Sequence, residues 1–125
     1  MEFVKYLIAQ EVDYKWGLVT TTVGVQEGAS GMSYPYGDHP AKYHFNQEKG
    51  RVLDEFQVVY IIRGAGWFES AHCARTKVSA GDAFIIFPGE SHSYLPDTEI
   101  GWAEAWVGFK GECANHLVRQ GFFHR

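Results

Sequence analysis

The segment GDAFIIFPGESH, residues 81–92, decides the fold of this 125-residue chain. It starts with the turn residues Gly81-Asp82, continues through the apolar run 83–87, and stops at Pro88-Gly89 before a strand that begins at His92. Short apolar runs between clusters of Gly, Pro and Asp are typical of β-strands joined by tight turns. The segment therefore predicts two successive strands around a Pro-Gly turn.

The rest of the chain repeats this pattern. The run 55–63 is apolar on both faces and ends at Gly64-Ala65-Gly66, so residues 67–70 are expected to return as its hairpin partner. Residues 112–120 carry apolar residues at helical spacing, with Gly121 as a C-terminal stop. The further expected strands are 18–26, 77–79, 83–87, 92–95 and 102–109. Seven or so strands with one terminal helix predict an all-β sandwich or barrel.

Composition excludes several classes of protein. The formal net charge is −4 and basic residues are scattered singly, so no surface is expected to neutralise a row of phosphates. The longest apolar runs have five residues, far below the roughly 18 that span a bilayer, so no membrane partner is expected. The first residues lack the pattern of a secretion signal, and the two cysteines form no C-x-x-C pair. A cytoplasmic protein with reduced thiols is the resulting expectation.

The opening segment also resembles the second conserved motif of the cupin barrel. Gly81, Gly89 and His92 match that motif, whereas Phe87 stands where it usually has Pro. The resemblance implies a small jelly-roll barrel, in agreement with the strand pattern.

The first cupin motif normally supplies two His and one Glu as metal ligands, ahead of a glycine that corresponds to Gly64. The matching positions are Arg51, Leu53 and Gln57, so three of the four ligands of a metal cupin are missing. A divalent transition metal needs at least three donors of the His, Cys or carboxylate type. We therefore expect no metal, no other cofactor and no catalytic residue.

Several segments, taken in order, resemble the N-terminal effector-binding domain of AraC-type transcription regulators from about Val12 to Phe123. The matching segments are Trp16-Gly17-Leu18, Tyr34-Pro35, His39-Pro40, 50–53, Phe56-Gln57, 64–70, 87–94 and 101–109. The resemblance implies a cupin-like jelly-roll barrel with a short C-terminal helix. It also implies one ligand-binding and dimerisation domain over residues 1–125, with an N-terminal arm at 1–16, the start of a helical segment at 112–120, and a DNA-binding domain outside this chain.

Alternation along the last long strand places Trp102, Glu104 and Trp106 on one face. Sugars present apolar C–H faces that stack on indoles, and hydroxyl groups that need polar partners, so Trp-x-Glu-x-Trp suits a sugar. The alternative is that both tryptophans fill the barrel and Glu104 pairs with a neighbouring cation.

His92 and Tyr94 likewise share a face and can both donate or accept hydrogen bonds. The resemblance to arabinose-binding members implies ligand contacts for Tyr94, Trp106 and, after a two-residue gap, Arg51; Glu104 replaces a family His. Gln57 stands where the metal cupins hold their ligand, although alternation leaves open which face of its strand points inward. The candidate ligand-binding residues are Arg51, Gln57, His92, Tyr94, Trp102, Glu104 and Trp106.

The expected function is that of an effector-sensing domain. It would bind a small polar molecule, expected to be a carbohydrate, inside the barrel, and would control DNA binding by a helix-turn-helix domain that this chain lacks. The intact protein is expected to be a homodimer. The alternatives are a metal-dependent cupin enzyme of the isomerase or dioxygenase type, and a dimerisation module without ligand.

Overall fold

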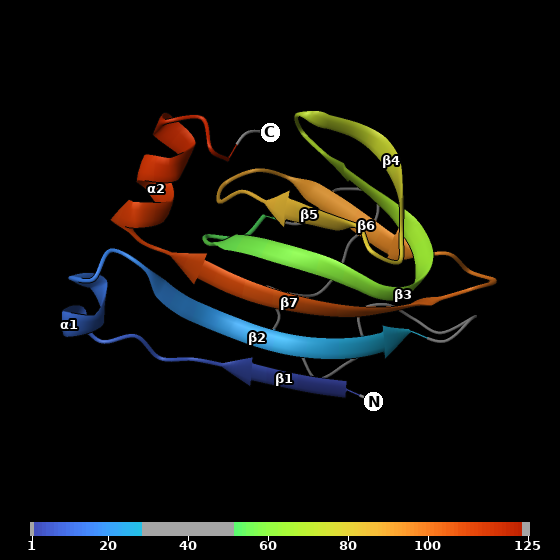
Figure 1. Ribbon diagram of the computed structural model, residues 1–125, viewed down its shortest axis with the longest axis horizontal. Helices are drawn as coiled ribbons and strands as arrows, with labels where there is room; N and C mark the ends of the chain where they lie inside the picture. Colours follow the sequence, from blue (N-terminus) through green and yellow to red (C-terminus); the bar gives the residue numbers. More distant parts are fainter. Residues whose placement is uncertain (1, 29–51, 124–125) are drawn as a thin grey trace.

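The computed structural model of the protein describes residues 2–28 and 52–123. Figure 1 shows a curved set of strands with both helices at one end. The elements in chain order are β1 (Glu2–Tyr6), α1 (Glu11–Tyr14), β2 (Val19–Gly28), β3 (Phe56–Ser70), β4 (Cys73–Ser79), β5 (Ala83–Ile86), β6 (His92–Pro96), β7 (Trp102–Lys110) and α2 (Glu112–Arg119). The described part is mostly β, as the sequence predicts.

Strand β3 belongs to two sheets. Its first half pairs antiparallel with β7 and β5, and the strand order across that sheet is β1, β2, β7, β3, β5. Its second half, from Ala65 onward, pairs with β4 and β6. The predicted hairpin at Gly64-Ala65-Gly66 is therefore wrong, because Phe56–Ser70 is one continuous strand that passes from one sheet to the other.

Close contacts at two glycines explain why the chain bends there instead of turning back. Gly64 has a φ of 88°, a left-handed conformation that favours glycine, and a Cβ there would lie 2.2 Å from the carbonyl oxygen of Gly101. A Cβ on Gly66 would lie 2.3 Å from the carbonyl oxygen of Leu95 and 2.6 Å from the Trp102 ring. The glycines thus let three strands and an indole approach each other closely.

The two sheets enclose an aromatic core. The rings of Phe68 and Phe84 stack with centroids 4.3 Å apart, and Phe84 lies 5.3 Å from Tyr94. A second cluster, around Phe56 and Phe87, packs under α2 through Ala114.

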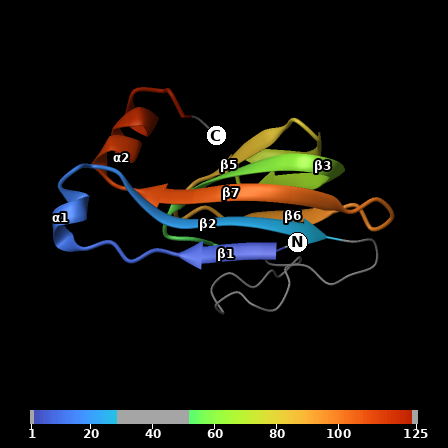
Figure 2. The ribbon, with the colours of Figure 1, turned by 60° about the horizontal axis from the view of Figure 1, so that its bottom comes forward.

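The N-terminal segment is attached to the same barrel, as Figure 2 shows. β1 pairs antiparallel with β2 and forms an edge of the sheet. The backbone N–H of Cys113, at the start of α2, donates to the carbonyl of Gly17, just after α1. This hydrogen bond ties the two helical ends of the chain together.

Candidate functional site

The inward face of β7 carries a buried acid beside an indole. Trp102 and Glu104 are 1% and 2% exposed, and Trp106 is half-buried against the core. The indole N–H of Trp102 donates a hydrogen bond to Oε2 of Glu104 at 2.5 Å. A buried carboxylate requires such donors because it has lost its water. The structure thus brings together the three residues of the Trp-x-Glu-x-Trp pattern on one inner face.

Polar residues of β2 and β3 lie beside this face. Gln26 is the cross-strand neighbour of Glu104, and Thr22 and Gln57 flank Gly108 from the two sides. All three side chains are at most 3% exposed. Thr22 Oγ1 has no hydrogen-bond partner in the described part of the chain. These residues give the interior unusual polarity for a barrel of this size.

Strand β3 turns its Gln57 face inward. Gln57, Val59 and Ile61 are buried, whereas Tyr60 and Ile62 on the other face are each 46% exposed. Alternation alone left both orientations open, and pairing with β7 selects one because it sets Ile61 opposite Glu104.

His92 and Tyr94 extend the site across to β6. Both are buried, and their rings stack nearly parallel with centroids 5.9 Å apart. Tyr94 also stacks against Trp102 at 6.0 Å. His92, Tyr94, Trp102 and Glu104 therefore form one connected group from two strands. Arg51 lies outside the described residues.

The ring of Trp106 packs over a glycine on the neighbouring strand β2. Gly24 lies directly opposite Trp106, and a Cβ there would be 2.2 Å from Cζ2 of the indole. The missing side chain leaves space for the ring, so the orientation of Trp106 depends on β2.

Sequence reasoning missed the contribution of β2. Thr22, Gly24 and Gln26 alternate with valines, and the usual pattern would turn the valines inward. The structure does the opposite and buries Thr22 and Gln26 while Val23 and Val25 are half-buried on the outside. The sequence signal for the inward face of β2 is Gly24, which leaves room for the Trp106 ring. That signal can be recognised only once β2 is known to pair with β7.

The residues at the metal positions of a cupin do not fit a metal. Of the matching positions that the structure describes, Leu53 packs in the apolar core and Gln57 offers only an amide, which leaves His92 as the one strong donor at those positions. No group of three or more His, Cys, Asp or Glu within residues 2–28 and 52–123 is arranged to hold a metal ion.

A cavity of about 260 Å³ opens between β4 and β5. Its lining is mostly apolar and consists of Phe68, Ser70, Cys73, Thr76, Val78, Ala83, Phe84, Ile85, Phe87 and Glu90. None of the predicted ligand-binding residues that the structure describes lines this cavity. Neither helix in the described ranges has the length and apolar character needed to cross a membrane.

The family model described as AraC-like ligand binding domain matches residues 30–125 of this chain. The raffinose operon transcriptional regulatory protein of Pediococcus pentosaceus is 30% identical over 74 residues, which cover 59% of this chain and 27% of that protein. The Msm operon regulatory protein of Streptococcus mutans is 26% identical over 69 residues, which cover 55% of this chain and 24% of that protein. The matches thus span about a quarter of the length of these relatives, both of which are operon regulators.

Solved structures agree on the fold. YhaK from Escherichia coli matches with a TM-score of 0.61 at 11% identity, covering 89% of this chain and 45% of that one. A predicted oxalate decarboxylase from Thermotoga maritima matches with a TM-score of 0.54 at 18% identity, covering 87% of this chain and 80% of that one. The Cnp3 cupin domain of Schizosaccharomyces pombe matches with a TM-score of 0.53 at 13% identity, covering 95% and 71%. The predicted cupin-like barrel with a short C-terminal helix is confirmed; at these identities the likeness concerns the fold alone.

Proposed function

Because the chain belongs to the family of AraC-like ligand binding domains, we propose that it senses a saccharide bound inside its barrel. In the intact protein, this binding would shift a homodimer between arrangements that differ in their affinity for DNA. Such a shift requires that the saccharide bind the two arrangements with different affinity. DNA would be contacted by a separate helix-turn-helix domain of the intact protein.

The observation that carries the proposal is the buried polarity of the interior. Thr22, Gln26, Gln57 and Glu104 are at most 3% exposed and lie on the inner faces of three adjacent strands. Burying a polar group costs free energy unless it forms hydrogen bonds, and valine or leucine would fill the same volume at lower cost. A receptor for a hydroxylated ligand uses a small set of buried donors and acceptors of this kind.

The kinds of side chain support a saccharide in particular. The half-buried indole of Trp106 would offer a flat apolar surface to C–H faces, and Trp102 holds the carboxyl group of Glu104 through its N–H. Glu104 and the two amides would offer acceptors and donors to hydroxyl groups. One relative is named for the raffinose operon. Raffinose and its component sugars are therefore the first ligands to test. We assign His92, Tyr94 and Arg51 to the same site as further polar contacts.

The competing function of a metal-dependent cupin enzyme has less support. The likeness to a predicted oxalate decarboxylase concerns the fold, and the two curated relatives are transcriptional regulators. Proteins with this fold have many unrelated functions, so the function must be inferred from the residues of the site. Among the described residues, the site offers one imidazole and one carboxyl group, whereas an enzyme of that class needs at least three strong ligands.

Calorimetry and thermal unfolding with raffinose, melibiose, galactose and glucose test the proposal, with benzoate as a ligand that lacks the hydroxyl pattern. A sugar present at 100 times its dissociation constant stabilises the protein by about 2.7 kcal/mol. Tyr94→Phe keeps the ring stack and removes one hydroxyl, so affinity should fall about 2- to 13-fold with little change in melting temperature.

Tyr14→Phe is the matched control, because Tyr14 lies on α1 and is 42% exposed. It should leave saccharide affinity unchanged. The proposal is overturned if none of the sugars shifts the unfolding transition, or if both Tyr variants reduce affinity equally.

A further inference from the structure

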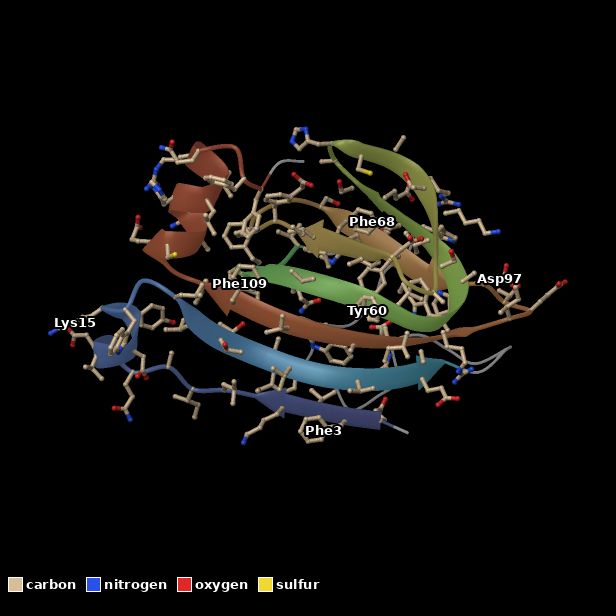
Figure 3. The ribbon with its side chains drawn as sticks, in the orientation of Figure 1. Phe3, Lys15, Tyr60, Phe68, Asp97 and Phe109 are labelled. Atoms are coloured by element: carbon tan, nitrogen blue, oxygen red, sulfur yellow. The ribbon has the colours of Figure 1, made fainter. Side chains whose placement is uncertain are left out.

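The cavity between β4 and β5 is separate from the interior that we assign to the saccharide. Phe68 of β3, labelled in Figure 3, and Phe84 of β5 form part of its wall, and their rings stack with centroids 4.3 Å apart. The ring of Phe84 also lies 5.3 Å from that of Tyr94, so it borders both the cavity and the proposed saccharide site. A molecule in this cavity would therefore meet a different set of residues.

The volume and the walls of the cavity define the body of a ligand that fits. An apolar cavity of about 150 Å³ is enough to bind benzene, and this cavity measures about 260 Å³. It can hold one aromatic ring with a short side chain. Phe68, Val78, Phe84 and Phe87 of the lining are all at most 9% exposed. Their rings offer edges and faces against which an aromatic ligand packs well.

One acidic side chain borders this apolar space. Glu90, between β5 and β6, is 8% exposed, and none of the described lining residues is basic. The imidazole Nε2 of His72 lies 3.7 Å from Oε2 of Glu90, but it carries a positive charge only when protonated. Arg75 on β4 is engaged elsewhere, since it donates to Glu69 at 2.9 Å and lies 3.8 Å from the centre of the Trp67 ring. A positive group on the ligand would best complement this cavity.

Two further polar groups of the lining spend their hydrogens on the protein itself. Oγ1 of Thr76 donates to the carbonyl oxygen of Ala74 at 2.7 Å, and the thiol of Cys73 donates to the same oxygen at 3.5 Å. Because a hydroxyl group has a single hydrogen, Thr76 can offer the cavity only lone pairs. A ligand therefore needs N–H donors, which an ammonium group has and a carboxylate lacks.

We propose that this cavity is a second binding site, for a small primary amine with an aromatic body of the size of phenethylamine. Its ammonium group binds the carboxyl group of Glu90, and its ring packs against Phe84 and Phe87. An aromatic amino acid is disfavoured, because its own carboxylate would also approach Glu90. The site does not depend on whether the barrel interior binds a saccharide.

Calorimetry with three probes of similar shape tests the proposal. Phenethylamine should bind, phenethyl alcohol should bind about 10-fold more weakly because its hydrogen bond to Glu90 is not between two charges, and phenylpropanoate should not bind. Glu90→Gln keeps the shape of the side chain and removes its charge. It should weaken phenethylamine at least about 10-fold and leave phenethyl alcohol nearly unchanged.

Glu99→Gln is the matched control, because Glu99 is an exposed acid in the turn before β7. It should leave the affinity for phenethylamine unchanged.

Alkylation of Cys73 locates the bound amine. Cys73 lines the cavity, and the exposed Cys113 is the other cysteine of the chain, so the reaction is followed in Cys113→Ser protein. Saturating phenethylamine should slow the reaction of Cys73 with iodoacetamide several-fold, since a ligand in the cavity covers the thiol. Phenylpropanoate at the same concentration should leave the rate unchanged.

Several results would overturn the inference. These are a failure of phenethylamine to bind, equal affinity for phenylpropanoate, equal losses in Glu90→Gln and Glu99→Gln, and an alkylation rate of Cys73 that phenethylamine does not change. A loss of amine binding in Glu104→Gln in place of Glu90→Gln would put the amine in the barrel interior and would overturn it too.

Discussion

Replacing Gly24 by alanine should destabilise the protein through a single contact, the one with the indole of Trp106. The added Cβ would lie 2.2, 2.5 and 2.7 Å from Cζ2, Cη2 and Cε2 of that ring. Carbon atoms in contact need about 3.5 Å, so the ring must move by more than about 1 Å. Overpacking of this kind costs about 1–3 kcal/mol.

The net change in the free energy of unfolding combines this overpacking cost with an entropic gain of opposite sign. An alanine in a strand loses less conformational entropy than a glycine on folding, which returns about 0.5–1 kcal/mol. The expected net loss of stability for Gly24→Ala is therefore about 0–2.5 kcal/mol, or up to roughly 10 °C in melting temperature. Urea unfolding monitored by circular dichroism measures it directly.

The decisive comparison uses Trp106→Phe as background. A phenylalanine has no atoms at the Cζ2 and Cη2 positions, so the two shortest of the three contacts disappear. Gly24→Ala should then cost the Trp106→Phe protein less stability than it costs the wild type, by about 1 kcal/mol or more. If Gly24→Ala destabilises both backgrounds equally, its cost does not come from the indole and the assigned packing of Trp106 over Gly24 is wrong.

Two further predictions concern the bend and the buried acid. Gly64→Ala should cost more than about 3 kcal/mol, because it combines a φ of 88° with a backbone oxygen at 2.2 Å; Gly81→Ala, with a φ of 93° and open space, should cost about 1–2 kcal/mol. Equal losses for the two variants, measured by chemical unfolding, would contradict the close approach at the bend. Trp102→Phe removes the donor to Glu104 and should cost at least about 2 kcal/mol, whereas Glu104→Gln keeps an acceptor for the indole and should cost less. A reversed order in thermal unfolding would refute that pairing.

Local patterns predicted most of the strands and the spacing within them. The turn at Pro88-Gly89 and the strands around it lie where expected, and so does the helix after Gly111. The shared inner face of Trp102, Glu104 and Trp106 also followed from alternation, because side chains in a strand alternate whatever lies beside them. The candidate residues Gln57, His92 and Tyr94 are all buried, and their role in ligand binding stays a prediction.

The predicted hairpin failed for a physical reason. Gly64-Ala65-Gly66 has the composition of a turn, and local propensity cannot distinguish a reversal from a sharp bend. The outcome depends on the residues that come close to the glycines, namely Gly101, Leu95 and Trp102, which are distant in the sequence.

The sequence by itself determined the class of fold, the strands and the alternation within each strand, since these depend on neighbours along the chain. Tertiary structure alone decided which face of β2 and of β3 points inward. Thr22 and Gln26 are buried and Val23 is not, because the inner position opposite Trp106 requires the glycine at position 24, and the parity of the strand then orients every other residue. Contacts between strands set which face points inward, and the residue pattern of one strand does not specify the strand that pairs with it.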